Sequence, residues 1–416
     1  MQGHPTYHGG CEPSRKVGLL MGSLIMEKPK ILFAGFDEPE LLPVISAEVT
    51  DYGWRGLTLD GEVLEVNGNK RQIPASISIT IGNRYLGQRE VTNELNIDID
   101  EYLEWFNSAV TDYKRNHLSS ALLHSDAAIA LAPTLRARFN RAMILLAMGR
   151  WKEGFDEYLA LEDHPPFIRP QVKEALVNGM KLWRGEDLNG KCILVIHAHG
   201  FGDTIQCLRY IKHLKAMGAE VMVDVPEELD RLVNGNLRGG RSVDYFIPFL
   251  HLLGRLYVSP IIHDNGPYLN VDPKLVSKWK SHLGPATCKR IGIAWSIGKP
   301  SVGDYPRDIE LAGLVDNLDP TAAIHSVQIQ PPNQEVRVNA HEFEDFADCA
   351  AFMICMDEII TVDTAAVHLA GAIGHPNIKL LLSKWASWRW LKPWYRNVKI
   401  CRQTSDGDWI SALRQC

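Results

Sequence analysis

Residues 192–210 read CILVIHAHGFGDTIQCLRY, a stretch that passes from an apolar run through two glycines into a helical pattern. The helical pattern continues to Gly218, and the apolar segment AEVMVDVP follows at 219–226. A strand, an amphipathic helix and a second strand within about thirty residues make a βαβ unit. Because the two strands of such a unit run parallel, this stretch predicts a parallel sheet.

A second series of the same kind begins with RIGIAWS at 290–296. It continues through segments that should alternate between helix and strand, which read ELAGLVDNL, AIHSVQIQ, CAAFMICM, EIITVD, TAAVHLAGAIG and NIKLLLS. We therefore expect an α/β protein with two Rossmann-type domains, at 166–285 and 286–416, joined near 270–289. The two sheets should face each other across a cleft.

The chain before residue 166 changes its pattern twice. Apolar alternation, as in SISITI, is typical of strands, and a period near 3.6 replaces it at about residue 100. We predict a disordered leader at 1–29, a small β-rich domain at 30–99 and helical hairpins at 100–165.

The helical hairpins carry small residues where neighbouring helices touch. Ala121 and Ala128, with Pro133 closing the unit, fit the pattern of tetratricopeptide (TPR) repeats. About two such units are present, fewer than the three or more that are stable alone, so they should pack on a neighbouring domain. A plain helical linker is the open alternative.

Composition excludes several classes of protein. The 416 residues carry a net charge of -6, which does not favour nucleic acid or an anionic membrane as a default partner. No apolar run approaches the ~20 residues that span a bilayer. The eight cysteines show no spacing typical of zinc ligands or of a disulfide framework. We expect reduced, mostly buried thiols in a cytoplasmic protein.

The GFGD segment lies between the first strand and its helix. Ligands of open parallel sheets bind at the carboxyl ends of strands, so this loop is a candidate site. Gly200 and Gly202 allow the backbone to approach a ligand closely. Asp203 is a candidate catalytic carboxylate, although a carboxylate at the start of a helix is also a common cap.

The segment VDTAAVHLAGAIGHPN at 362–377 is a second candidate site. A strand should end at Val362, and the helix that follows should start near Asp363 and Thr364. The free N–H groups of that helix, with the Thr364 hydroxyl, are suited to a diphosphate. Ala365 and Ala366 permit close approach, and His368 lies one turn further on, although a structural histidine is the alternative for His368 alone.

These motifs together resemble heptosyltransferase-like glycosyltransferases of the GT-B fold, and more closely those that contain TPR repeats. The resemblance covers about residues 103–412. The segments that carry it, in the order of the family, are LWRGEDLNGKCILV, GFGDTIQCLRY, IGIAWS, HSVQIQ, DFADCAAFMICMDEIITVDTAAVHLAGAIGHP and SWRWLKPWYRNVKICRQ.

The resemblance implies an inverting sugar transfer from a nucleotide-diphosphate sugar, without a metal or another cofactor. Asp203 matches the general base of the family. The residues that match the donor and phosphate side are Lys299, Gln328, Asp363, Thr364, Ala365, Ala366 and His368. Arg307 has a weaker claim to that side. His199, Gly200 and Gly202 belong to the acceptor-side loop, and the acceptor should be a macromolecule, a glycan or a protein.

The sequence departs from the family at two places. Ala198-His199 replaces the usual Glu-Gln pair, and Asp308 replaces a serine that commonly follows Arg307. These departures keep two other functions open: an inactive transferase-like scaffold, and a nucleotide-sugar epimerase or hydrolase.

Two further segments have weaker functional interpretations. Asp98 and Asp100 have the spacing of a metal-binding DxD motif, but they precede a helix and are better read as caps. The aromatic and basic segment at 384–399 keeps a nucleic-acid acceptor open as a minor alternative.

Overall fold

The computed structural model describes six strands between residues 30 and 90 by their backbone, together with most of the chain from residue 99 onward. The described ranges of that larger part are 99–161, 169–233, 242–256, 266–297, 307–328, 336–384, 388–391 and 393–416. The chain divides into two compact units, Met1–Gly56 with Leu64–Leu95, and Leu57–Val63 with Asn96–Cys416.

The strands near the amino terminus follow the alternating segments of the sequence. Four of them form a sheet in the order β1-β2-β3-β4, and β5 pairs with β6 in antiparallel fashion. Their bounds are Lys30–Phe33 (β1), Glu40–Thr50 (β2), Gly53–Thr58 (β3), Val63–Asn67 (β4), Ser76–Ile81 (β5) and Arg84–Glu90 (β6). That these strands form a β-rich domain stays a prediction, and the predicted leader at 1–29 lies outside the described residues.

Four helices follow, as the change of period predicts: Ile99–Lys114 (α1), Leu118–Leu131 (α2), Leu135–Ala147 (α3) and Trp151–Leu159 (α4). Thr134 caps α3 by accepting the Ala137 N–H at 3.1 Å, and its hydroxyl contacts the Tyr102 hydroxyl of α1 at 2.7 Å. Phe155 of α4 belongs to the same hydrophobic core as the first parallel sheet, which confirms that the helices pack on a neighbouring domain. Their assignment as TPR repeats stays a prediction.

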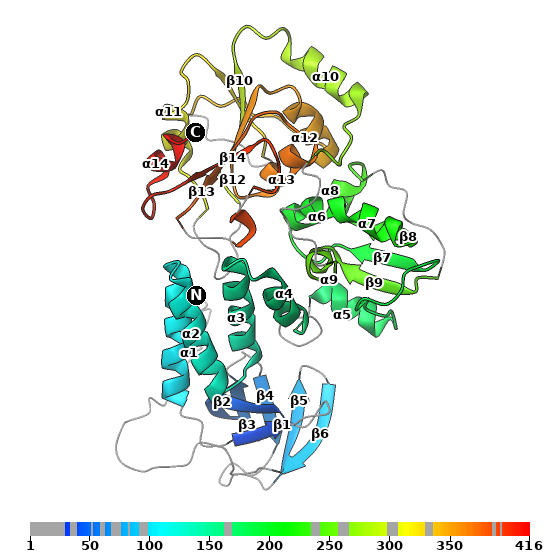
Figure 1. Cartoon of the computed structure of the whole chain (residues 1–416), viewed down its shortest axis with the longest axis vertical. Helices are drawn as coiled ribbons and strands as arrows, with labels where there is room; N and C mark the ends of the chain where they lie inside the picture. The colour runs from blue at the N-terminus through cyan, green and yellow to red at the C-terminus, as the bar shows by residue number, and fades with distance from the viewer. Residues whose placement is uncertain are drawn as a thin grey trace, which may run out of the picture. The chain divides into compact units, whose positions relative to one another are not determined.

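The first parallel sheet has the order β8-β7-β9, with β7 at its centre (Figure 1). Both neighbours of β7 run parallel to it, as the βαβ pattern predicts. The bounds are Cys192–Ile196 (β7), Glu220–Asp224 (β8) and Tyr245–Pro248 (β9). Side chains of β7 alternate between two cores. Ile193 and Val195 pack with the helices after the GFGD loop, and Ile196 packs with helix α5 (Pro170–Val177).

The expectation of one continuous helix after the GFGD loop was wrong. Helix α6 already begins at Phe201 and ends at Cys207, a 3₁₀ turn follows at Leu208–Tyr210, and α7 covers Ile211–Ala216. The Arg209 Nε donates to the Gln206 carbonyl at 3.0 Å. In a continuous α-helix that carbonyl accepts from residue 210, so the side chain competes with the helical hydrogen bond.

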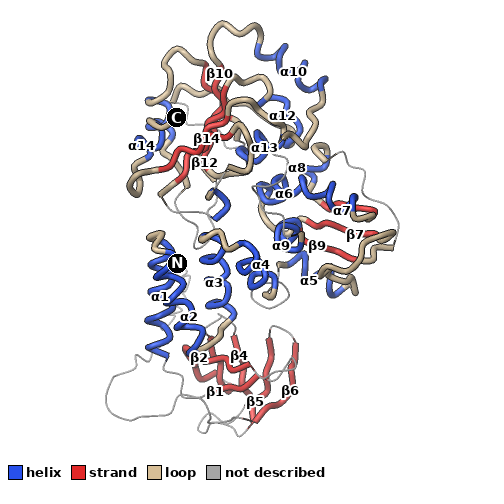
Figure 2. Tube along the Cα trace, in the orientation of Figure 1, coloured by secondary structure: helices blue, strands red, loops and turns tan. Residues whose placement is uncertain are grey.

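The second parallel sheet has five strands in the order β11-β10-β12-β13-β14. Its strands β10, β12 and β14 are labelled in Figure 2. Every neighbouring pair is parallel. The bounds are Arg290–Ala294 (β10), Ala323–Ser326 (β11), Glu358–Val362 (β12), Ile378–Leu382 (β13) and Val398–Arg402 (β14).

Helices cover both faces of this second sheet. One face packs against α12 (Phe346–Met353) and α13 (Ala365–Ala372). The other packs against α11 (Leu311–Asp316) and α14 (Trp409–Leu413). Two parallel sheets, the second with helices on both faces, confirm the α/β class. The cleft that the sequence predicted between them stays a prediction.

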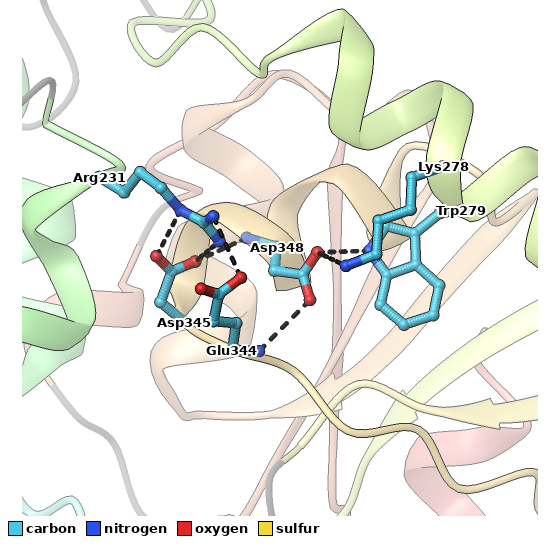
Figure 3. A network of polar contacts seen from close by, with 6 residues as sticks. All are labelled: Arg231, Lys278, Trp279, Glu344, Asp345 and Asp348. Carbon is cyan, nitrogen blue, oxygen red and sulfur yellow. Dashed lines mark hydrogen bonds and ion pairs between the residues drawn. The ribbon is translucent and has the colours of Figure 1, made fainter.

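A polar network joins the elements on one side of the two sheets (Figure 3). Arg231, just after the short helix α8 (Glu227–Asp230), forms a fork with the Asp345 carboxylate, at 2.7 and 2.9 Å. Asp345 caps α12 through the Asp348 N–H. The buried Asp348 carboxylate accepts from the Trp279 indole of α10 (Pro273–Leu283) at 2.8 Å. The carboxylates at the start of α12 thus join this helix to the segment after α8 and to α10.

The cysteines differ in part from the expectation of free thiols throughout. Cys401 of β14 and Cys416 form a disulfide with a Cα–Cα distance of 6.0 Å. The tertiary fold brings the last helix back beside β14, which spacing in the sequence does not reveal. Cys192, Cys207 and Cys349 are free and buried, as expected. Among the described residues, no helix is long and apolar enough to cross a membrane.

Gly371 tests the packing of α13. A Cβ at this position would overlap the buried ring of Tyr395. We expect Gly371→Ala to lower the free energy of unfolding by ~1–3 kcal/mol, since overpacking outweighs the better helix propensity of alanine. Denaturant unfolding would measure this. Gly313→Ala in α11 is the control, because its Cβ meets only one atom, Oε2 of Glu310 at 3.1 Å, and no buried ring; equal losses in both variants would contradict the packing argument.

Candidate functional site

Both predicted motifs lie where the strand order reverses. In the first sheet the chain runs from β7 to β8 on one side and then to β9 on the other. In the second sheet it runs from β10 to β11 and then back to β12. The GFGD loop follows β7, and Asp363 and Thr364 follow β12. Loops diverge at such positions and leave the carboxyl ends of the strands accessible, which is where open α/β sheets bind ligands.

The fold brings the two motifs into contact. A Cβ added to Gly202 would lie 3.0 Å from His368 Cδ2 and 3.4 Å from the Ala365 Cα. The start of α6 therefore packs directly on the start of α13. A residue with a side chain at 202 would separate them, which is the physical reason for glycine here.

Asp203 is held on both of its carboxylate oxygens. Its Oδ2 accepts the Gly200 N–H at 3.2 Å, and its Oδ1 lies 2.8 Å from the Arg389 guanidinium. Gly200 is the N-cap of α6, so Asp203 is the third helical residue and not the cap itself. Its bond to the Gly200 N–H is the second half of a capping box, which fixes the carboxylate in place.

The charge around Asp203 favours its ionised form. Burial alone would raise the pKa of the carboxyl group. The Arg389 guanidinium, with the Gly200 N–H, outweighs this effect, and the pKa of Asp203 is lowered. The side chain keeps about 20% of its surface exposed. Asp203 is thus an accessible carboxylate that stays deprotonated at neutral pH.

The two histidines before the GFGD loop have different surroundings. His197 Nδ1 lies 2.8 Å from the Thr204 hydroxyl, which ties the end of β7 to α6. His199 Nε2 lies 3.5 Å from the Tyr158 hydroxyl of α4, and its ring contacts His251. Burial, and then the nearby His251, lower the pKa of His199 to about 3. A neutral imidazole therefore joins the loop after β7 to helix α4.

The start of α13 carries the residues predicted for phosphate. Thr364 is the N-cap, and its hydroxyl accepts the Ala366 N–H at 3.3 Å. The carboxylate of Asp363 is buried and accepts from the Trp390 indole at 2.8 Å. Arg307 Nη1 donates to the Asp363 carbonyl at 3.0 Å, which places a positive charge beside this turn. Helix dipole and guanidinium together make the turn suited to an anion.

His368 is the end of a hydrogen-bonded chain through two tyrosines. The Tyr268 hydroxyl donates to the Ile205 carbonyl at 3.0 Å, because a carbonyl can only accept. The Tyr395 hydroxyl lies 2.9 Å from His368 Nδ1 and 3.4 Å from the Tyr268 hydroxyl. His368, Tyr395 and Tyr268 thus form one chain of contacts that ends on the Ile205 carbonyl, and the direction of the bond at His368 follows the tautomer of its ring.

His368 is neutral in this environment. Burial lowers the pKa of its imidazole to about 4, and the carboxylates of Asp363 and Asp203 only partly oppose that effect. The ring of His368 therefore carries no full positive charge at neutral pH.

Residues at the ends of β10 and β11 organise the neighbouring loop. Gln328 Oε1 accepts the N–H groups of Trp295 and Ser296, at 2.9 and 3.2 Å. Asp308 accepts the Ser296 hydroxyl at 2.9 Å and the Ile297 N–H at 2.8 Å. Asp308, the residue at which a serine was expected, thus holds the loop after β10 through two hydrogen bonds. Lys299 lies outside the described residues, so its role stays a prediction.

Two arginines near the site were missed by the sequence reasoning. Arg389 pairs with Asp203, although it lies in the aromatic and basic segment at 384–399, which was considered only as a nucleic-acid surface. Arg209 is buried among aromatic rings, those of Tyr268, Trp394 and Tyr395. In the sequence, these arginines could have been singled out because each lies within or beside an aromatic segment.

A buried glutamine was missed as well. Gln206 is fully buried, and neither atom of its amide has a hydrogen-bond partner among the described residues. Its place in α6, the short helix that carries Asp203, was the available signal.

In the part of the chain that the structure describes, no group of three or more His, Cys, Asp or Glu side chains could hold a metal ion. Asp98 lies outside the described residues, and Asp100 lies in the first turn of α1, which begins at Ile99.

Comparison with known proteins gives distant relatives. No family model matches the chain. Protein FlbA of Caulobacter vibrioides is 25% identical over 327 residues, which cover 65% of this chain and 52% of FlbA. The chain therefore spans about half the length of this curated relative.

Two solved structures are similar over about half of the chain. The glycosyl transferase family 9 structure from Veillonella parvula has 11% identity and a TM-score of 0.36, and covers 53% of this chain and 88% of that one. The ADP-heptose lipopolysaccharide heptosyltransferase II of E. coli has 14% identity and a TM-score of 0.37, and covers 54% and 97%.

Gly202→Ala tests the contact between the two motifs. The new Cβ would press on His368 and on the backbone of Ala365. We expect a loss of ~1–3 kcal/mol in the free energy of unfolding, measured by denaturant titration. Gly200→Ala is the matched control, because its Cβ would meet only Asp203 Oδ2 at 3.6 Å, an ordinary contact. A Gly202 variant as stable as the control would show that α6 and α13 do not pack closely.

The protonation of His368 can be measured directly. Its folded-state pKa of about 4 lies below the ~6.5 of an unfolded histidine, so folding favours the neutral ring. The resulting stabilisation is fully present above pH ~6.5 and is lost as the pH falls toward 4. We expect ring nitrogen NMR, assigned with His368→Gln, to show a neutral imidazole at pH ~5.5, between these two values. A midpoint near the unfolded value would contradict the assignment of buried neutral His368.

Proposed function

We propose that this protein is a metal-independent inverting glycosyltransferase, which moves a sugar from a nucleotide-diphosphate sugar to a macromolecular acceptor. The observation that carries the proposal is the contact of Gly202 with Ala365 and His368. This contact supports the proposal, because the start of α6, which carries Asp203, packs on the start of α13, which we assign to phosphate. Base and leaving-group site are the two parts that an inverting sugar transfer requires.

The proposed reaction assigns one role to each side. Asp203 accepts the proton of the acceptor hydroxyl while that oxygen forms a bond to the anomeric carbon of the donor sugar. The bond between the anomeric carbon and the diphosphate oxygen breaks, and its electron pair leaves with the diphosphate. Attack from the face opposite to the leaving group inverts the anomeric centre.

The leaving diphosphate gains negative charge during this reaction. The N–H groups at the start of α13, the hydroxyl of Thr364 and the neutral imidazole of His368 are the groups that we assign to it. Arg307 adds a positive charge next to the same turn. Helix dipole, hydrogen-bond donors and arginine provide charge stabilisation from the chain itself.

The helices before the first sheet contact the loop that we assign to the acceptor. Tyr158 of α4 contacts His199, and Trp151 and Phe155 contact the ring of Trp388 beside Arg389. We propose that this helical surface guides a glycan or protein chain toward Asp203, since helical repeats present extended binding surfaces. The acceptor, the sugar and the nucleotide are left open by the proposal.

A non-catalytic scaffold is the second candidate function. The ion pair of Asp203 with Arg389 favours it, because a carboxylate that is already paired with a cation is a weaker base. Under this alternative the same residues would hold the two motifs together and bind a ligand without turnover.

The substitution Asp203→Asn separates the two candidates. The asparagine keeps an oxygen for the Gly200 N–H but cannot accept a proton. We expect nucleotide binding at least as tight as that of the wild type and a loss of transfer of at least ~10²-fold, the size of a general-base contribution. A panel of nucleoside diphosphates in a calorimeter and of nucleotide sugars in a turnover assay would measure both.

The outcomes of this experiment are distinct. Transfer at an unchanged rate in Asp203→Asn would leave Asp203 with a capping role only. Binding without turnover in the wild type would support the scaffold. A wild-type chain that binds no nucleoside diphosphate would remove the basis of the transferase proposal.

A further inference from the structure

Arg389 lies next to the proposed base, and the residue after it contacts the start of the proposed phosphate site. Its Nη2 lies 2.8 Å from Asp203 Oδ1. Its charge also acts on His368. Burial is the main cause of the lowered pKa of His368, the nearby carboxylates oppose it, and the Arg389 charge lowers the pKa further. The next residue, Trp390, donates to Asp363 at the start of α13 and stacks on the His368 ring at 5.4 Å. One guanidinium is thus within the electrostatic range of both sides.

The backbone around Arg389 is fixed on both sides of the residue. Trp388 is buried against Trp151 and Phe155, and Trp390 is held by its bond to Asp363. The Trp394 indole donates to the carbonyl of Arg389 itself. The guanidinium lies over the Trp388 ring, 4.9 Å from its centroid, and the side chain keeps about 26% of its surface exposed. A fixed backbone with a long, partly exposed side chain allows the guanidinium to exchange partners without a change in the fold.

A diphosphate is a stronger partner for arginine than a single carboxylate. It carries more negative charge, and its oxygens match the planar guanidinium fork in bidentate fashion. We propose that Arg389 pairs with Asp203 only while the donor is absent, and that it transfers to the diphosphate when the donor binds. This inference rests on the proposed function. It adds that the donor binds first and that its binding makes Asp203 a stronger base.

Asp203 stays in place during this exchange. Its Oδ2 remains bonded to the Gly200 N–H at 3.2 Å. The charged and titratable groups that then face it are His197 and His199 from its own loop and His368 from α13. Burial keeps the first two largely neutral, as it does His368. Without the guanidinium, the carboxylate becomes more basic and accepts the acceptor proton more readily.

The exchange predicts an unusual effect of Asp203→Asn on anion binding. Inorganic pyrophosphate is the probe, titrated calorimetrically into the full chain at neutral pH and low ionic strength. We expect Asp203→Asn to bind pyrophosphate at least about fivefold more tightly than the wild type, because Arg389 no longer has a competing partner. Arg389→Gln should bind at least about fivefold more weakly, and Arg389→Lys should recover part of the loss because it keeps the charge.

The double variant Asp203→Asn/Arg389→Gln decides whether the effect passes through Arg389. The exchange requires it to bind like Arg389→Gln alone, so that the gain from Asp203→Asn disappears. The same gain in both backgrounds would show a simple loss of negative charge and would overturn the proposal. So would an Asp203→Asn variant that binds pyrophosphate no better than the wild type.

Failure of this inference is separable from failure of the proposed function. If the wild type binds nucleoside diphosphates and transfers sugar while Asp203→Asn shows no tighter binding of pyrophosphate, only the exchange of Arg389 is wrong. If the wild type binds neither pyrophosphate nor any nucleoside diphosphate, both proposals fail. Circular dichroism of each variant, with Arg389→Lys as the conservative form, controls for folding.

Discussion

The close approach of α6 to α13 is the constraint on which the rest of the site depends. It exists because residue 202 has no side chain, so that the first turn of α6 can lie against Ala365 and the ring of His368. Each helix follows a central strand of a different parallel sheet. One glycine therefore brings together two loops that lie far apart in the chain. The carboxylate of Asp203 and the helix start at Thr364 become parts of one site only through this contact.

Burial and charge then set the chemical state of each group in the site. His368 is buried without enough negative charge to keep a proton, so it is neutral and acts through a hydrogen bond. Asp203 is next to Arg389 and stays ionised. The two residues thus have opposite responses to similar surroundings, because desolvation removes charge unless a partner of opposite sign is close.

Much of the fold was predictable from local patterns. The strands at 192–196, 290–294 and 358–362 are short apolar runs bounded by polar turns, and the parallel pairing follows from the helices between them. The start of α13 at Thr364 was predictable from its capping chemistry. The break after α6 was not, because it depends on Arg209, whose side chain takes a helical carbonyl while it packs against rings from distant segments.

The sequence by itself determined the two parallel sheets, the position of each loop at the end of its strand, and the type of residue available for chemistry there. These features depend on hydrophobic period, glycines and caps, which act over a few residues. The tertiary structure alone decided that Arg389 pairs with Asp203, that His368 is neutral, and that Cys401 meets Cys416. Ion pairs, desolvation and disulfides depend on distances between residues far apart in the chain, and those distances exist only once both sheets have packed.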